Sequence, residues 1–324
     1  MRAVVVSTPG GPEVLTVAEK PVPVVGPTDV LIAVAAAGVN GADLVQRRGA
    51  YPSPPGTPDW PGMEVSGIVE QVGAEVAGFA VGDRVCALLP GGGYAERVSA
   101  DERLVLPVPD GVELIHAAGL PEVAATVWSN VFMLAGLHEG QTLLVHGGSS
   151  GIGSIAIQLG VARGARVIAT AGTDSKVAFC ESVGAIGVNY REQDFVQSVK
   201  ESTGDVGVNV VLDMVGGDYI ARDVRALAID GKIMVIANRS GAASEFDVGR
   251  LMAKRGRIWG TTLRARPIEE RAHILAQLRE HVWPLIESGR VRPIVDSIFP
   301  LSEAPDAHRR MESSEHIGKI LLTV

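Results

Sequence analysis

The chain has 324 residues, which is long enough for two domains with separate cores. Its composition, 46% hydrophobic and 20% charged, is that of an ordinary globular protein, and its formal net charge of −8 argues against a surface built for nucleic acid or anionic membranes. Two cysteines, Cys86 and Cys180, provide neither a disulfide framework nor a metal-ligand cluster.

No apolar run approaches the roughly 18 residues that a membrane-spanning helix needs. The first residues read as strand, turn and strand rather than as a signal peptide. We therefore expect a cytoplasmic protein with reduced thiols and with no membrane or nucleic-acid partner.

Residues 1–121 are predicted to be β-rich, with Gly and Pro between the strands. The expected strands are Ala3–Ser7, Val14–Ala18, Val30–Ala36, Val65–Val72, Arg84–Ala87 and Tyr94–Ser99. A short helix is expected at Ala42–Arg48, because Asn40 can cap it and Asp43 follows three places later. Residues 49–62 contain five prolines, which predict a stiff, irregular loop suited to walling a cleft.

From about residue 122 the pattern changes to alternating helices and strands. The expected helices are Glu122–Leu134, Ile152–Arg163, Ser175–Val183, Phe195–Thr203 and Tyr219–Leu227. The expected strands are Thr142–His146, Arg166–Ala169, Gly187–Asn189, Val208–Asp213, Lys232–Ile236 and Arg257–Gly260. Near-continuous apolar strands such as Val208–Leu212 predict a parallel sheet that is covered on both faces.

After Arg264, an amphipathic helix is expected at Ile268–Ile286, followed by strands near Ile294–Phe299 and Ile317–Thr323. This last stretch is too short to form a domain alone, so we predict that it completes the first one. The predicted fold is α/β. Residues 1–121 and 265–324 form a β-rich catalytic domain, and residues 122–264 form a doubly wound nucleotide-binding domain inserted into it, with the cofactor in the cleft.

Gln141–Gly160 carries the pattern of a pyrophosphate cradle: an apolar strand, a Gly/Ser-rich turn and the start of a helix. Two registers fit the dinucleotide fingerprint, Gly151-x-Gly153-x-x-Ala156 and Gly148-x-Ser150-x-x-Gly153. The spacing Gly147-x-x-x-Gly151-x-Gly153 is also that of short-chain dehydrogenases. Those enzymes need a later Tyr-x-x-x-Lys pair, and none of the four tyrosines has lysine four places on, so this alternative is rejected. The predicted cradle residues are Ser149, Ser150, Gly151 and Ile152.

The end of the second strand of the nucleotide domain indicates the choice of cofactor. NAD-binding folds place a carboxylate there to accept from the ribose 2′-OH. Here the strand runs into Ala171, Gly172 and Thr173 instead. Thr173 and Ser175 can donate to a 2′-phosphate, with Lys176 as the counter-charge. The sequence therefore predicts NADPH, and an inward-turned Asp174 would weaken that preference.

Several stretches together resemble the medium-chain dehydrogenase/reductase superfamily along the whole chain, in its zinc-free quinone oxidoreductase (zeta-crystallin-like) branch. The stretches are MRAVVVSTPGGPEVLTV, VAAAGVNGADLVQRRGAYPSPPG, GMEVSGIVEQVG, GDRVCALLPGGGYAERV, HGGSSGIGSIAIQL, NVVLDMVGG and HIGKILLTV. Within it, the sequence most resembles the apoptosis-linked subgroup, at residues 40–51, 87–93 and 262–264. The resemblance implies a GroES-like catalytic domain beside a Rossmann domain, a homodimer or homotetramer, and reduction of quinones by NADPH.

The resemblance also assigns residues. Lys176 and Tyr190 match the positions that hold the 2′-phosphate in the family, and Lys319 matches a cation that closes over the cofactor. Arg264 matches a cofactor contact, although a surface or interface role remains open for it. The other cofactor contacts that the resemblance implies are Asn40, Thr126, Val215, Ala237, Asn238 and Leu263.

Zinc is not expected. Zinc enzymes of this superfamily use a cysteine and a Gly-His-Glu histidine where this chain has Asn40 and Met63, and neither an amide nor a thioether is a normal Zn²⁺ ligand.

Hydride transfer to an electrophilic acceptor needs orientation, exclusion of water and stabilisation of the oxyanion. The candidate catalytic residues are Asn40, Asp43 and Tyr51. Asn40 could donate to nicotinamide or substrate, Asp43 could position it, and Tyr51 could stack on the ring or donate its proton. Helix capping alone is the competing interpretation for Asn40 and Asp43. Three functions remain open: a quinone reductase, an alkenal or enoyl reductase acting on an activated C=C bond, and a catalytically weak NADPH-binding sensor or structural protein.

Overall fold

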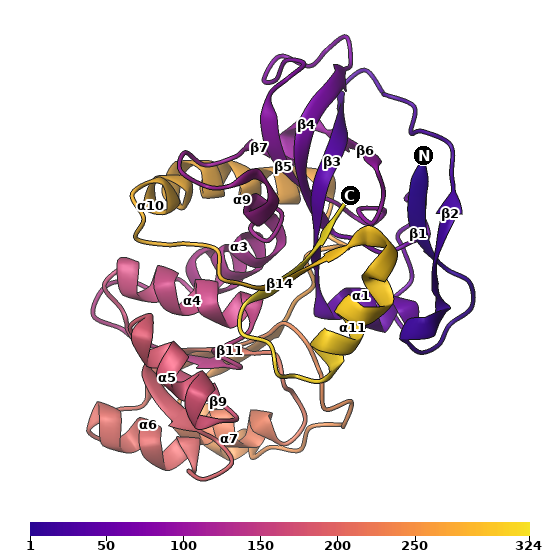
Figure 1. Cartoon of the computed structure of the whole chain (residues 1–324). Helices are drawn as coiled ribbons and strands as arrows, with labels where there is room; N and C mark the ends of the chain where they lie inside the picture. The colour runs from indigo at the N-terminus through magenta and orange to yellow at the C-terminus, as the bar shows by residue number, and fades with distance from the viewer. The chain divides into compact units, whose positions relative to one another are not determined.

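The computed structural model describes all residues 1–324, and the chain divides into two compact units. Unit 1 comprises residues 1–125, 263–289 and 293–324, and unit 2 comprises residues 126–262 and 290–292. The chain therefore begins in unit 1, builds unit 2 and returns to finish unit 1 (Figure 1).

Unit 1 is built on β-sheets. Its strands are β1 (Arg2–Val6), β2 (Leu15–Glu19), β3 (Asp29–Val39), β4 (Glu64–Val72), β5 (Arg84–Leu88), β6 (Arg97–Asp101), β7 (Val105–Pro107), β14 (Val295–Pro300) and β15 (Lys319–Thr323). The larger sheet has the order β14-β15-β3-β4-β5-β7, and β6 also pairs with β3. β15 runs antiparallel to β3, so the last strand of the chain completes the sheet that its first third began (Figure 1).

Most helices of unit 1 are short, and α9 (Ile268–His281) is the longest with 14 residues. They are η1 (Pro12–Val14), α1 (Gly41–Arg47), η2 (Glu102–Leu104), α2 (Leu114–Ala117), α3 (Pro121–Val127), α9 (Ile268–His281), α10 (Trp283–Glu287), η4 (Leu301–Glu303) and α11 (Ala304–Glu312). The single helix expected at Ile268–Ile286 is wrong, because the chain breaks at Val282 between α9 and α10. Pro284 explains the break: it has no N–H to donate to the preceding turn, and its ring would clash there.

Unit 2 has six parallel strands: β8 (Thr142–His146), β9 (Arg166–Ala171), β10 (Ile186–Asn189), β11 (Val208–Asp213), β12 (Leu227–Val235) and β13 (Arg257–Gly260). Their spatial order is β10-β9-β8-β11-β12-β13. Counted from the first strand of the unit, this is the doubly wound order 3-2-1-4-5-6, whose direction reverses between β8 and β11. Ligands of such sheets bind at the carboxyl ends of the strands beside that reversal.

The helices of unit 2 are η3 (Trp128–Leu134), α4 (Gly151–Ala162), α5 (Asp174–Ser182), α6 (Phe195–Thr203), α7 (Tyr219–Ala226) and α8 (Val248–Ala253). The helix expected at Glu122–Leu134 is divided, because α3 gives way to the π-helical η3. The N–H of Ala135 donates to the Asn130 carbonyl at 2.9 Å, one residue farther back than in an α-helix. No helix of the chain has both the length and the apolar character needed to span a bilayer.

Each unit has its own buried core. That of unit 1 gathers apolar side chains of β3, β4 and β5, such as Ile32, Val65 and Val85. That of unit 2 gathers Leu144, Ile168 and other strand residues against the helices. These cores hold the strand ends and helix starts that carry the functional side chains.

Candidate functional site

The glycine-rich turn of unit 2 joins β8 to α4 beside the reversal in strand order. Gly147 has φ of +67°, a left-handed conformation that favours glycine. The Ser150 hydroxyl caps α4 by accepting the Gly153 N–H at 3.0 Å. The first turn of α4 therefore presents unpaired N–H groups and the positive end of a twelve-residue helix, which together suit an anion. The predicted cradle residues Ser149, Gly151 and Ile152 all lie in this turn or first helical turn.

Gly153 lies where the start of the helix approaches the turn most closely. A Cβ atom at this position would be 2.3 Å from the Gly147 carbonyl oxygen and 2.7 Å from the Gly148 backbone. The third glycine of the dinucleotide fingerprint serves such close packing. The geometry therefore favours the register Gly148-x-Ser150-x-x-Gly153 of the two that the sequence left open.

The end of β9 brings together the residues predicted for the 2′-phosphate. Thr173 caps α5 by accepting the Lys176 N–H, and its hydroxyl lies 3.1 Å from that of Ser175. A Cβ atom at Gly172 would be 2.7 Å from the Tyr190 hydroxyl oxygen, so the tyrosine lies directly over this glycine. The Asp174 carboxylate accepts from the Asn189 amide at 2.8 Å, which occupies the one acidic group of the segment.

Two further loops follow the carboxyl ends of β11 and β12. The Asp213 carboxylate accepts the N–H groups of Val215 at 2.6 Å and Gly216 at 3.1 Å, which fixes the first loop. A Cβ atom on Gly216 would be 2.5 Å from Asn238 Oδ1, so the second loop passes close by. Ala237 and Asn238 are exposed there. Thr126, by contrast, is buried, and its carbonyl accepts from Asn130 at 2.8 Å.

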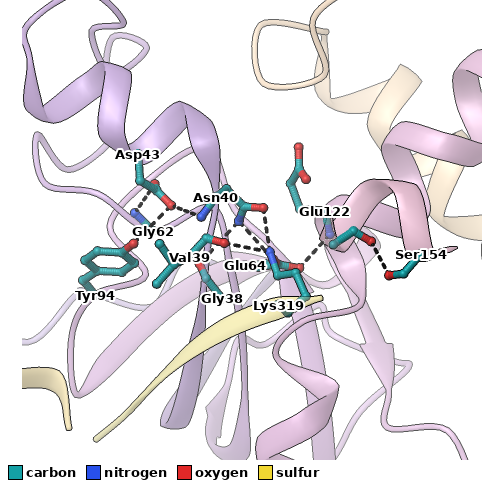
Figure 2. A network of polar contacts seen from close by, with 11 residues as sticks. Gly38, Val39, Asn40, Asp43, Gly62, Glu64, Tyr94, Glu122, Ser154 and Lys319 are labelled. Carbon is teal, nitrogen blue, oxygen red and sulfur yellow. Dashed lines mark hydrogen bonds and ion pairs between the residues drawn. The ribbon is translucent and has the colours of Figure 1, made fainter. Parts of the chain in front are cut away.

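In unit 1, Asn40, Glu64 and Lys319 form a buried network (Figure 2). The Lys319 ammonium pairs with Glu64 at 2.6 Å and donates to Asn40 Oδ1 at 2.7 Å and to the Val39 carbonyl at 2.9 Å. The Asn40 amide donates to Glu64 at 3.0 Å and to the Gly38 carbonyl at 3.3 Å. The network joins β3, β4 and β15 at the start of α1.

Asp43 is fully buried on α1, beside this network. Its carboxylate accepts the Asn40 N–H at 2.8 Å, the Gly62 N–H at 3.0 Å and the Tyr94 hydroxyl at 3.2 Å. Burial raises the pKa of Asp43 to about 6, against the opposing effects of the two N–H groups, Lys319 and Tyr94. Asp43 therefore closes the helix start, as the capping interpretation expects, and it also ties the proline-rich loop to α1.

Tyr51 lies on the proline-rich loop and packs against Arg264. The guanidinium carbon is 5.1 Å from the centre of the phenol ring, within cation–π range. Arg264 also donates to Ser53 at 2.9 Å and to the Pro90 carbonyl, and it lies beside the Tyr51 carbonyl at 3.5 Å. Burial raises the pKa of Tyr51, so its hydroxyl keeps its proton at neutral pH.

These contacts show where three of the residues predicted from sequence lie. Both N–H groups of the Asn40 side chain are bound within the protein, so they are not available to donate to a substrate in this structure. Lys319 is a buried member of the same network. Arg264 is buried and binds the Tyr51 loop. Leu263, next to it, is also buried.

Three residues of this site in unit 1 were not predicted from the sequence. Glu64 is completely buried and joins Lys319 to Asn40. Tyr94, which the sequence places only at the start of an expected strand, donates to Asp43, and His308 on α11 contacts Tyr94. Glu64 stands in Gly62-Met63-Glu64, so its place in a family motif was the one available signal. Nothing local marks Tyr94 or His308.

His146, the histidine beside the cradle, is buried and bound on both ring nitrogens. Nδ1 lies 3.0 Å from the Thr170 hydroxyl, and Nε2 lies 2.8 Å from the Asp223 carboxylate. Burial raises the pKa of Asp223. His146 is thus a strand-end residue whose polar atoms are satisfied within unit 2.

The fold and these sites define a two-domain dehydrogenase or reductase: a β-rich unit and a doubly wound unit with a dinucleotide turn. Residues 26–110 match the alcohol dehydrogenase GroES-like domain, and residues 184–322 match the zinc-binding dehydrogenase family. The chain is 34% identical to the quinone oxidoreductase of Rattus norvegicus, over 99% of this chain and 97% of that protein. It belongs to the quinone oxidoreductase family of the medium-chain dehydrogenases/reductases.

Solved structures agree with this assignment. A quinone oxidoreductase of Escherichia coli complexed with NADPH is 30% identical, with a TM-score of 0.89 over the whole of both chains. A structure described as an NAD-dependent alcohol dehydrogenase is 31% identical, with a TM-score of 0.87 over the whole of both chains. This chain is thus similar both to a structure described as complexed with NADPH and to one described as NAD-dependent.

The name of the second matching family raises the question of zinc. Zn²⁺ in proteins takes thiolate, imidazole or carboxylate ligands, usually at least three from the protein. No three His, Cys, Asp or Glu side chains of this chain lie together in a way that could hold a metal ion. The residues present do not fit a zinc site.

Proposed function

We propose that this chain is an NADPH-dependent quinone oxidoreductase that works without a metal. The observation that carries the proposal is the end of β9, where Tyr190 lies over Gly172, Thr173 caps the helix that carries Lys176, and the one nearby carboxylate is bound to Asn189. Its relatives support the same function, because they are named quinone oxidoreductases and one of them is complexed with NADPH.

The residues of unit 2 fit NADPH. We infer that the first turn of α4 binds the pyrophosphate, as the N–H groups left open by the Ser150 cap suggest. The 2′-phosphate would be held by the Thr173 and Ser175 hydroxyls, the Lys176 ammonium and Tyr190. Val215, Ala237, Asn238 and Thr126 would contact the nicotinamide half of the cofactor from the carboxyl edge of the sheet.

Bound NADPH supplies the hydride, and the chain must orient the acceptor and stabilise the oxygen that becomes negative. Tyr51 suits this task in our proposal, because its hydroxyl stays protonated and can donate to that oxygen. Arg264 holds the ring from one side, and Asp43 ties the loop that carries Tyr51 to α1 through Gly62. Asn40 and Lys319 then act by keeping the start of α1 in place rather than by touching the acceptor.

The direct test is to follow NADPH oxidation at 340 nm with a panel of quinones from one to three fused rings. We expect turnover with NADPH and much less with NADH. Faster reduction of acrolein-type acceptors than of any quinone would favour the alkenal reductase instead. Tight NADPH binding with no reduction of any acceptor would favour a sensor or structural protein and count against the proposal.

Lys176→Ala should weaken NADPH binding selectively. A charge-assisted hydrogen bond to phosphate contributes about 1.5–3 kcal/mol, so we expect the KM for NADPH to rise by roughly 10- to 100-fold while that for NADH changes little. The Lys200→Ala variant, at the end of α6, serves as a control for loss of one positive charge. Equal effects on both cofactors would show that Lys176 does not recognise the 2′-phosphate.

We further propose that the protein is a homodimer or homotetramer joined at β13. This strand pairs only with β12, so it is one of the two open edges of the six-stranded sheet, the other being β10. Open edges are normally covered, and exposed apolar side chains at Trp259, Met252 and Val248 lie on or just before this strand. Light scattering should give two or four times the 33.8 kDa of one chain, and Trp259→Lys should lower that mass. A wild-type monomer would contradict this assembly.

We propose a cytoplasmic location as well. Both cysteines are free and buried, which agrees with a reducing compartment.

A further inference from the structure

A chain of buried hydrogen bonds leads from Asp43 away from the proposed site. The Tyr94 hydroxyl lies 3.2 Å from Asp43 Oδ2 and 3.1 Å from His308 Nε2. His308 Nδ1 lies 3.2 Å from a guanidinium nitrogen of Arg47, which also pairs with Glu312 at 2.5 Å. Asp43, Tyr94 and His308 have no exposed surface, and Arg47 has 1%.

The donor and the acceptor of each hydrogen bond in this series follow from Arg47, at its outer end. Arginine can only donate, so His308 Nδ1 must accept. Burial, and after it the Arg47 charge, lowers the pKa of His308 to about 3, so the imidazole is neutral and carries its one proton on Nε2. That N–H donates to the Tyr94 oxygen, and the Tyr94 proton is left to donate to Asp43. Tyr94 keeps this proton because burial raises its pKa well above the ordinary value.

This arrangement is closed to proton transfer from solvent. A relay would need a group at its outer end that can take up and release a proton, but Arg47 occupies the only free nitrogen of His308 and does not deprotonate in proteins. The chain must therefore act by fixing orientation.

Its effect falls on Asp43. If Asp43 took up a proton, its new O–H would meet one of three donors: the Asn40 N–H, the Gly62 N–H or the Tyr94 hydroxyl. The only donor able to turn away is Tyr94, whose proton would then point at the Nε2–H of His308. Two donors facing each other in a buried site are unfavourable. His308 thus prevents the rearrangement that a protonated Asp43 needs.

We propose that His308 is a positioning residue: by donating to Tyr94 it confines the tyrosine proton to Asp43, and so keeps Asp43 a carboxylate that fixes the start of α1 and the Tyr51 loop. The functional part of this inference rests on the proposed quinone reductase activity. The other charges that act on Asp43 and its neighbours are Lys319 on β15, Glu64 on β4, Arg264, Arg48 and Glu312. All of them stay in place in the variants below.

The test compares His308→Leu and Tyr94→Phe with His308→Gln, whose amide can both accept from Arg47 and donate to Tyr94. Two quantities are measured: the pKa of Asp43 by carboxyl ¹³C titration, assigned with Asp43→Asn, and the acidic limb of kcat/KM for quinone reduction. Tyr94→Phe removes one hydrogen bond to the charged form of Asp43, and His308→Leu lets the tyrosine proton turn away from the protonated form; either change shifts a pKa by about one unit. We expect the wild-type value of about 6 to rise by about one unit in His308→Leu and Tyr94→Phe, with the acidic limb moving by the same amount. His308→Gln should stay near the wild type.

Each outcome decides the question. An Asp43 pKa that is unchanged in His308→Leu and Tyr94→Phe overturns the proposal. A raised pKa without movement of the acidic limb also overturns it, because the carboxylate would then not be used in the reaction. If the wild type reduces no acceptor, the proposed function fails, and the ¹³C titration still shows whether His308 sets the state of Asp43. Variants that do not fold are recognised by circular dichroism, and His308→Gln and Tyr94→Phe then carry the comparison.

Discussion

Lys319→Met is expected to destabilise the protein by about 3–5 kcal/mol, the range measured when one partner of a buried ion pair is removed. Glu64 has no exposed surface, and its carboxylate accepts from Lys319 at 2.6 Å, from Asn40 at 3.0 Å and from the Glu122 N–H at 2.9 Å. Methionine fills a similar volume but brings no charge. The variant therefore leaves a buried carboxylate with two neutral donors.

Urea unfolding followed by circular dichroism gives this loss. The double variant Glu64→Gln/Lys319→Met removes both charges and should recover most of it, because a neutral amide can keep the bond from Glu122. Arg255→Met, which breaks the exposed pair with Asp230, is the control and should change stability little. A loss in Lys319→Met no larger than in this control would contradict the assigned network.

The elements of the fold could be predicted where the information is local. Runs of apolar residues with Gly and Pro between them located Val208–Asp213 and Arg257–Gly260 without error, and the glycine pattern located the turn before α4. Pro284, inside the expected helix, was a local sign of the break at Val282. The amphipathic pattern across residues 268–286 hid it, because the apolar face continues through the break.

The contacts of the candidate site are of a different kind. Asn40 and Lys319 are 279 residues apart in the chain, and Tyr94 and His308 are 214 apart. Each such pair depends on the register of β15 against β3 or on how α11 packs, and neither follows from the spacing of residues in the sequence. A buried lysine is rare unless it is paired with an opposite charge, but the sequence does not indicate which carboxylate pairs with it. The sequence alone therefore predicts Asn40, Asp43 and Lys319 as site residues, but it does not predict the hydrogen bonds and ion pairs that they form.

Gly153→Ala is expected to weaken NADPH binding by about 100-fold or more. The added Cβ would lie 2.3 Å from the Gly147 carbonyl oxygen, and the Gly148 backbone is 2.7 Å away. These are backbone atoms of a tight turn, so they cannot rotate aside as a flexible side chain could. Relief requires α4 to move off the turn, and strain of this kind typically costs about 1–3 kcal/mol and occasionally more. The N–H groups of the first helical turn would then no longer be aimed at the phosphates, which adds to the loss.

Fluorescence titration with NADPH at 10 °C measures the effect while the variant is folded. Gly260→Ala is the matched control, because a Cβ there meets no atom within 4 Å and its backbone is not left-handed. The two variants thus differ in the space around one methyl group rather than in its chemistry. If Gly153→Ala binds NADPH as tightly as Gly260→Ala, the pyrophosphate does not rest on the start of α4, and the register Gly148-x-Ser150-x-x-Gly153 is not the binding fingerprint. If Gly153→Ala loses NADPH affinity but keeps its helical circular dichroism, the turn acts on the cofactor directly rather than through global stability.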